Sequence, residues 1–321
     1  MKQLNSRQQA LLAVLADGAF HSGEQIGVKL GISRAAISQQ IKSLRLLGLE
    51  IFSVTGKGYR LNTPLQLLNR ESIQQHLNDV PVHTCAVIDS TNQYMMAQLD
   101  RWQKGECLLA ETQTAGRGRR GRQWHSPFGS QFIMSMYWRL DDGPSAAMGL
   151  SLAIGVAVIQ ALESVGYRDL SLKWPNDIYM ARRKLAGILV EMSAAVGGIC
   201  HLVIGVGVNL NLPDAVIAQL DQPCAHLAEQ PVVVDRNQLS ATIIRALRNA
   251  LALFEKQGLT AFLMDWNRLD IFMQQPVQVL LGNQVIHGIY CGIDGQGNML
   301  LQDLEGMHKF VGGEISLRAD I

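Results

Sequence analysis

The stretch "GRGRRGRQW", residues 116–124, sets four arginines among three glycines. Segments typical of β-strands stand on either side of it, at 106–113 and 131–140, so we predict a loop on a folded scaffold rather than a disordered tail. Glycine lets a backbone approach a ligand closely, and the planar guanidinium of arginine matches the oxygens of phosphate and carboxylate groups. The stretch therefore predicts a loop that binds one small anion. The alternative is a solvent-exposed arginine-rich loop that binds no ligand.

Strand-like and helix-like segments alternate outward from this loop through the middle of the chain. Short runs rich in β-branched and aliphatic residues are separated by amphipathic or uncharged helical runs, which is typical of an α/β domain with a mixed sheet. Strands are expected within 83–90, 106–113, 131–140, 170–177, 184–194 and 201–211, and helices within 91–102, 145–164, 235–258 and 259–270. We assign residues 63–271 to this central domain.

Residues 143–162 carry no charge and have the length of a membrane-spanning helix, which needs about 20 predominantly apolar residues. The segment opens with Gly143-Pro144 and includes polar residues such as Gln160. We therefore interpret it as a helix buried in the core of a soluble domain, and we expect no membrane partner.

The spacing of the cysteines and histidines predicts neither a metal site nor a disulfide framework. The five cysteines include no CxxC pair, and the eight histidines form no HExxH motif, so a reducing compartment, the cytoplasm, is favoured. The N-terminus lacks the pattern of a cleavable signal. Two nucleotide motifs are also rejected, because Lys57 in "TGKGY" lacks Walker A spacing and "GVGVNLN" at 205–211 lacks the third glycine of a dinucleotide fingerprint.

The first 62 residues differ from the rest in charge. They hold eight Lys or Arg against three Asp or Glu, although the whole chain has a net charge of only +1, so we assign 1–62 to a separate module with its own partner. An amphipathic helix is expected at 6–17. Ser22 and Gln25 have the spacing of a capping box that opens a second helix, and Gly31 supplies the turn to a third.

The third helix of this module is predicted to be the recognition helix of a winged helix-turn-helix. Ser33 can cap it, apolar positions repeat along one face, and the opposite face is polar and basic. The segment 49–61 then reads as a basic hairpin, the wing. The predicted DNA-binding residues are Ser33, Arg34, Ser38, Gln39, Lys42, Lys57 and Arg60. A small helical domain that binds another protein is the alternative.

Short strands separated by Gly and Asn turns follow Pro276. This pattern predicts a small β-barrel at 272–321. The chain as a whole is therefore expected to be an α+β multi-domain protein.

Five motifs of the central domain occur in a fixed order. They are "DSTN" (89–92), "ETQTAGRGRRGRQW" (111–124), "KWPND" (173–177), "KLAGILVE" (184–191) and "GVGVNLN" (205–211). Together they closely resemble the biotin protein ligases. With the winged helix in front, essentially the whole chain resembles the bifunctional members of that family, which also repress the biotin operon. The resemblance implies that the C-terminal barrel is SH3-like.

The resemblance also implies a reaction and a set of site residues. Such ligases join biotin to AMP from MgATP, giving biotinyl-5'-AMP, and pass the biotinyl group to one lysine of the biotin carboxyl carrier domain of acetyl-CoA carboxylase. The implied catalytic residues are Arg117, Arg119, Lys184 and Asp177. The implied biotin-binding residues are Ser90, Thr91, Asn92, Gln113, Arg117, Gly118, Arg119, Lys184 and Gly187. The implied nucleotide-binding residues are Arg119, Arg122, Trp124, Asn176, Lys184 and Asn209.

Some of these assignments have a second interpretation. Asp177 suits Mg²⁺, a phosphate or the incoming lysine amine, but a structural turn after Pro175 explains it equally well. Residues 90–92 have the form of a helix cap as well as of a ligand site. Lys184 follows two arginines, so a solvated basic turn is its alternative.

The resemblance further implies that biotinyl-AMP acts as co-repressor and brings two copies of the chain together on operator DNA. The segment 141–149 is our candidate for part of the dimer surface. Two departures bear on retention of the adenylate: His125 replaces an aromatic residue, and 212–234 contains no aromatic side chain, with Val216, Ile217 and Leu220 as its apolar cover. A ligand-sensing regulator without ligase turnover and a lipoate-type ligase remain alternative functions.

Overall fold

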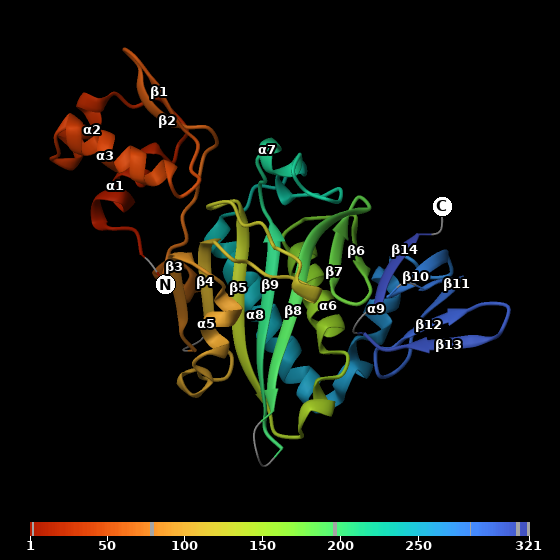
Figure 1. The fold of residues 1–321 in the computed structure, drawn as a ribbon. Coiled ribbons are helices and arrows are strands. Elements are labelled where there is room, and N and C mark those ends of the chain that lie inside the picture. Colours follow the sequence, from red (N-terminus) through yellow and green to blue (C-terminus); the bar gives the residue numbers. More distant parts are fainter. Residues whose placement is uncertain (2, 78–79, 195–197, 283, 313–314, 320–321) are drawn as a thin grey trace.

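The computed structural model describes residues 1, 3–77, 80–194, 198–282, 284–312 and 315–319. Within them, a small helical module and a five-stranded sheet lie at opposite sides of a large central sheet (Figure 1).

Three helices and a hairpin form the N-terminal module, as predicted. The helices are α1 (Ser6–Leu15), α2 (Gly23–Leu30) and α3 (Arg34–Arg45), and the hairpin joins β1 (Ile51–Val54) to β2 (Gly58–Leu61). The capping box of Ser22 and Gln25 is present, Ser33 caps α3, and Gly31 ends α2 with a φ of 64°. Ile37, Ile41 and Leu44 of α3 are buried, so its basic side faces outward. Local sequence signals therefore determine this module.

Seven strands form the central mixed sheet. Its order is β3-β4-β5-β9-β8-β7-β6, and only the β3–β4 pair is parallel. The strands are β3 (Val82–Ile88), β4 (Cys107–Gln113), β5 (Gln131–Leu140), β6 (Leu170–Lys173), β7 (Asp177–Met180), β8 (Arg183–Ala194) and β9 (Cys200–Asn209). The long β5, β9 and β8 pair Gln131 with Asn209 and Gly207 with Gly187 near one end of the sheet.

Helices cover both faces of this sheet (Figure 1). The short α5 (Thr91–Met96) packs on one face with its own apolar cluster. The other face carries α4 (Arg70–Gln75), α6 (Leu150–Ser164), α8 (Arg236–Gln257) and α9 (Leu263–Leu269).

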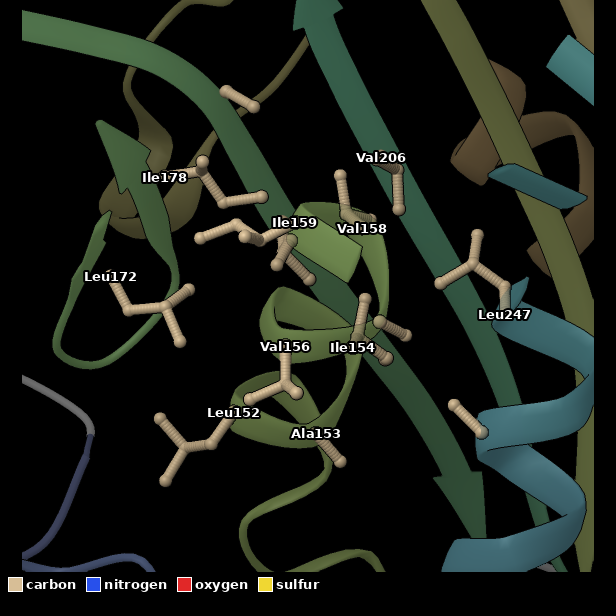
Figure 2. Close-up of a cluster of buried hydrophobic side chains, with 14 of the residues drawn as sticks. Leu152, Ala153, Ile154, Val156, Val158, Ile159, Leu172, Ile178, Val206 and Leu247 are labelled. Atoms are coloured by element: carbon tan, nitrogen blue, oxygen red, sulfur yellow. The ribbon is translucent and has the colours of Figure 1, made fainter. Parts of the chain in front are cut away.

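The apolar helix predicted at 145–164 is α6, which carries no charge before Glu163 and lies at the centre of the main core. Figure 2 shows its side chains, among them Ile154 and Val158, between the sheet and α8. The segment Pro144–Ser164 is apolar and long enough to cross a membrane, yet 67% of its most apolar window is buried inside the protein. Packing against the sheet thus accounts for its composition.

The C-terminal sheet has the order β13-β12-β11-β10-β14. Its strands are β10 (Pro276–Leu281), β11 (Gln284–Ile293), β12 (Met299–Gln302), β13 (Met307–Phe310) and β14 (Ile315–Ala319). Among the described residues β13 and β14 are not paired with each other, so the closed SH3-like barrel is not confirmed. Residues 313–314, within the strand-like segment 308–318, lie outside the described part.

Candidate active site

A cavity of about 630 Å³ opens beside residues 116–124, called the Arg/Gly loop below. The cavity lies between the start of α5, strands β8 and β9, and the segment that contains α7 (Asp214–Ile217). All fourteen residues predicted to handle the small substrates line it. They are Ser90, Thr91, Asn92, Gln113, Arg117, Gly118, Arg119, Arg122, Trp124, Asn176, Asp177, Lys184, Gly187 and Asn209. The fold thus brings together motifs that lie up to 120 positions apart in the sequence.

The Arg/Gly loop is a tight hairpin rather than an extended arm. Gly118 N donates to Arg122 O at 2.7 Å, and Trp124 N donates to Gly116 O at 2.9 Å. Its tip contains two left-handed residues, Arg120 with a φ of 59° and Gly121 with a φ of 70°. Hydrogen bonds across the hairpin therefore aim its side chains, and in Figure 1 the loop between β4 and β5 runs across the sheet toward β8.

Two arginines of this hairpin have partners across the cavity. Arg119 Nη1 donates to Asn176 Oδ1 at 3.0 Å, and Arg117 Nη2 lies 3.4 Å from Glu191 Oε1. Burial lowers the pKa of Arg119 from its usual value, which reflects partial removal of its guanidinium from water. A guanidinium in that position would interact more strongly with an anion than one exposed to bulk solvent.

The start of α5 is both a helix cap and a polar wall of the cavity. Ser90 accepts from Gln93 N as the N-cap, while Thr91 N and Oγ1 donate to Gln113 Oε1 at 2.8 and 3.1 Å. Asn92 Nδ2 donates to Glu191 Oε2 at 2.8 Å. The helix cap is therefore present, and residues 90–92 also line the cavity; their part in binding a ligand stays a prediction.

The indole of Trp124 lies against strands β8 and β9. A Cβ added to Gly187 would be 3.2 Å from the ring, and one added to Gly207 would be 2.8 Å from it. Trp124 Nε1 donates to Gln131 Oε1 at 3.1 Å, and Gln131 Nε2 donates in turn to Asn209 Oδ1 at 2.8 Å. Gly187 of β8 and Gly207 of β9 thus leave room for the indole.

Lys184 and Asp177 form an ion pair inside the cavity. Lys184 Nζ lies 2.8 Å from Asp177 Oδ1, and the two side chains are only 15% and 20% exposed. Lys184 belongs to β8, and its backbone bonds to Pro223 O and Ala225 N. The alternative of a solvated basic turn at Lys184 is therefore wrong, because the residue is part of a strand.

The segment 212–234 covers one side of the cavity. Val216 of α7 and Leu220, which follows that helix, line the cavity, whereas Ile217 of α7 does not. Among the described residues there is no group of three or more His, Cys, Asp or Glu side chains that could hold a metal ion, so Asp177 offers a single carboxylate rather than a metal cage.

Several polar residues at or near the cavity were not predicted from the sequence, among them Lys173, Gln131, Arg318, Ser135 and Glu191. Lys173, Gln131 and Arg318 line the cavity. Ser135 Oγ lies within hydrogen-bond distance of Thr91 Oγ1 and Asn92 Oδ1, and Glu191 joins Asn92 to Arg117. Lys173 stands in "KWPND" and had a signal. Glu191 likewise ends the motif "KLAGILVE". Gln131, Ser135 and Arg318 lie in strands without a motif, and only strand pairing or packing brings them to the site.

The predicted DNA-binding residues lie on the outer side of the N-terminal module. Arg34, Gln39, Lys42 and Lys57 are exposed. Arg60 is half-buried, with its guanidinium carbon 5.0 Å from the ring centre of Phe20 and 5.4 Å from that of Phe52. Arg60 is thus held by aromatic rings at the base of the wing.

Comparison with known proteins agrees with this architecture. Family models match an HTH domain at residues 7–60, the biotin/lipoate A/B protein ligase family at 84–209 and the biotin protein ligase C-terminal domain at 274–318. The bifunctional ligase/repressor BirA proteins of Escherichia coli and Salmonella typhimurium are each 47% identical over 309 residues, which is 96% of this chain and 96% and 97% of theirs.

A solved structure, the biotin protein ligase from Aquifex aeolicus in complex with biotin and ATP, is 27% identical with a TM-score of 0.63. The match covers 74% of this chain and 99% of that one. The motifs occur in order and meet at one cavity. The similarities to known proteins extend over nearly the full length of the chain. The chain belongs to the family of bifunctional biotin protein ligases and repressors.

Proposed function

We propose that this chain is an ATP-dependent biotin protein ligase that also represses transcription. It activates biotin to biotinyl-5'-AMP and transfers the biotinyl group to a lysine of a biotin carboxyl carrier protein. The observation that carries the proposal is the convergence of all fourteen predicted residues on one cavity. The names of the full-length relatives, which are ligase and repressor in one chain, support it.

Activation brings two anions together. An oxygen of the biotin carboxylate attacks the α-phosphorus of ATP, a mixed anhydride forms, and pyrophosphate leaves. Arg117, Arg119 and Lys184 lie around the cavity to reduce this repulsion, and the Gly118 backbone allows close approach.

The two substrates occupy different parts of the cavity. The biotin ureido group is neutral and polar, and the donors and acceptors of Ser90, Thr91, Asn92 and Gln113 suit it. Gly187, also predicted to bind biotin, lies against the Trp124 indole. The nucleotide lies along Trp124, Asn176, Asn209 and Arg122.

In the transfer step, the lysine amine of the carrier attacks the carbonyl carbon of the anhydride, and AMP leaves. Asp177 would orient that amine or help to hold the Mg²⁺ of MgATP, since Mg²⁺ is commonly bound by one or two carboxylates together with substrate phosphates. Lys184 pairs with Asp177 and lines the cavity, where its ammonium group can also contact an anionic ligand.

We further propose that the adenylate is the co-repressor and that two copies then bind operator DNA through the basic face of α3 and the wing. The segment 141–149 is proposed as part of the dimer surface, where Met148 is 43% exposed. The domains divide at 62/63 and at 271/272, and closure of the C-terminal sheet into an SH3-like barrel is part of the same proposal. Five free cysteines fit action in the cytoplasm.

Release of pyrophosphate tests the enzyme. The chain is incubated with MgATP and either biotin or lipoate, and we expect pyrophosphate only with biotin; preference for lipoate would contradict the substrate assignment. Lys184→Met should lower kcat for adenylation by about a hundredfold, typical for removal of one group that stabilises developing charge. Lys256→Met, an exposed lysine at the end of α8, is the matched control and should not change it.

A further inference from the structure

A buried ion pair lies behind the cavity, where it touches no proposed substrate position. Arg236, the first residue of α8, places Nη1 2.6 Å from Glu111 Oε2 of β4, and the side chains are 7% and 6% exposed. A pair this buried gains little net stability, because desolvation offsets the attraction between the charges. The role of the Arg236–Glu111 pair is therefore inferred from the other hydrogen bonds that the two side chains make.

On one side, the pair holds residues 66–69, the start of the central domain that links it to the DNA-binding module and is called the linker below. Leu68 N donates to Glu111 Oε1 at 2.6 Å, and Arg236 Nη1 donates to Gln66 O at 2.7 Å. The next residue of α8 adds a third contact, since Asn69 N donates to Asn237 Oδ1 at 2.8 Å. Backbone groups of residues 66–69 are thus bonded to buried side chains of the central domain.

On the other side, the pair reaches the cavity. Arg236 Nη2 donates to the backbone oxygen of Gln131 at 2.9 Å. The Gln131 side chain, in a residue only 1% exposed, bonds to the Trp124 indole and to Asn209. Asn209 Nδ2 donates to Ala225 O at 3.0 Å, within the segment that covers the cavity. One network of buried hydrogen bonds therefore runs from the linker to the site.

The linker is also bound to the DNA-binding module itself. Leu65 N donates to Ala16 O at 2.9 Å, and Leu65 and Leu67 pack against the apolar core of that module. A change in the position of the linker would therefore shift the helices of the DNA-binding module.

We propose that Gln131 is a positioning residue that sets Trp124 and Asn209, and that the Arg236–Glu111 pair couples it to the linker at residues 66–69. Occupancy of the cavity orders the linker, and an ordered linker improves binding in the cavity to the same degree, because coupling between two sites is reciprocal. This inference rests on the proposed function, since it takes biotin and ATP as the ligands.

Hydrogen exchange of the full chain tests the coupling. Peptides that cover residues 66–69 are followed with and without biotin and MgATP, alongside pyrophosphate release from the same sample. We expect the ligands to slow exchange at Leu68 and Asn69 about tenfold, the scale of one strengthened hydrogen bond to a charged group. An unchanged linker in a protein that releases pyrophosphate overturns the coupling; absence of pyrophosphate contradicts the proposed function instead.

Gln131→Met keeps the length of the side chain and removes both hydrogen bonds. It should raise the KM for ATP about tenfold with kcat nearly unchanged, and abolish the effect of the ligands on the linker. Gln131→Glu still accepts from Trp124 but cannot donate to Asn209, and should be intermediate. A wild-type linker response in Gln131→Met would overturn the proposal.

Glu111→Gln tests the pair from outside the cavity and serves if Gln131→Met does not fold. We expect a raised KM for ATP with unchanged kcat, and an effect that does not add to that of Gln131→Met. The matched control is Arg248→Met, which removes another buried arginine of α8, one that bonds to Gly105 O and Val80 O. It should leave KM and the linker response as in the wild type; a raised KM there, or additive effects of the other two variants, would contradict the coupling.

Discussion

Two glycines of β9 show how single residues shape the cavity. A Cβ added to Gly205 would lie 2.5 Å from Asn92 Oδ1, and one added to Gly207 would lie 2.8 Å from the Trp124 ring. Both distances are shorter than real Cβ contacts, so these positions accept no larger residue without movement of a site residue. Glycine is needed here for space, because neither residue has a positive φ.

Gly207→Ala should displace the Trp124 indole and break its bond to Gln131. Overpacking of this kind commonly costs about 1–3 kcal/mol, which corresponds to roughly a tenfold to hundredfold fall in kcat/KM for adenylation. Pyrophosphate release measures the fall, and the thermal midpoint shows whether the fold persists. Gly23→Ala in α2, where an added Cβ would lie at an ordinary 3.9 Å from Tyr59, is the control. Equal activity of the two variants would show that the indole position does not matter.

At the scale of elements, a turn of the C-terminal sheet holds the "KWPND" segment. Trp174 Nε1 donates to Gly297 O at 3.0 Å, and Asp294 closes that turn by accepting from Gln296 N and Asn298 N, both at 2.9 Å. Lys309 Nζ of β13 lies 2.6 Å from the same carboxylate. The C-terminal sheet therefore supports the segment that carries Asn176 and Asp177.

Acid should loosen this turn. Burial acts to raise the pKa of Asp294, but hydrogen bonds from Lys309, Asn298 and Gln296 outweigh it and hold the pKa well below the usual range. Because the folded pKa lies below the unfolded value of about 3.9, the stabilisation is complete above that pH and is lost as pH falls through the folded pKa. Asp294→Asn should have a lower thermal midpoint at pH 7 and a smaller further decrease between pH 4 and pH 2 than the wild type.

Calorimetry over that pH range compares the variants, with Asp100→Asn, an exposed aspartate, as the control. Parallel curves for wild type and Asp294→Asn would contradict a role for this carboxylate in the turn.

At the scale of the whole molecule, the DNA-binding module shares a core with the central domain. Ala86 of β3 and Phe128, which follows the Arg/Gly loop, are buried in the same apolar cluster as the helices of the module. Gln3 Nε2 also donates to Thr84 O at 2.8 Å. The module is thus docked on the catalytic sheet, beside the linker, rather than tethered freely.

Deletion of residues 1–62 should separate the two activities. We expect transfer of biotin to the carrier protein to remain largely intact, because the cavity is built by later residues, and operator binding to be abolished. Exposure of Ala86 and Phe128 should lower the thermal midpoint. Biotin transfer, gel shifts with operator DNA and calorimetry measure the three effects.

Lys42→Ala in the full chain is the matched control for that deletion. It should weaken operator binding without a change in thermal midpoint, because the exposed lysine takes no part in docking. Operator binding by the truncated chain would contradict the assignment of DNA recognition to this module.

The sequence by itself determined those features that depend on neighbours along the chain. Helix caps such as Ser22 with Gln25, the buried face of α3 and the motifs around the cavity were predicted, because capping and periodicity act within a few residues. Only the tertiary structure decided the positions of Gln131, Ser135 and Arg318. Each stands in a strand without a motif, and reaches the site through pairing or packing with residues far away in sequence, a contact that no local pattern records.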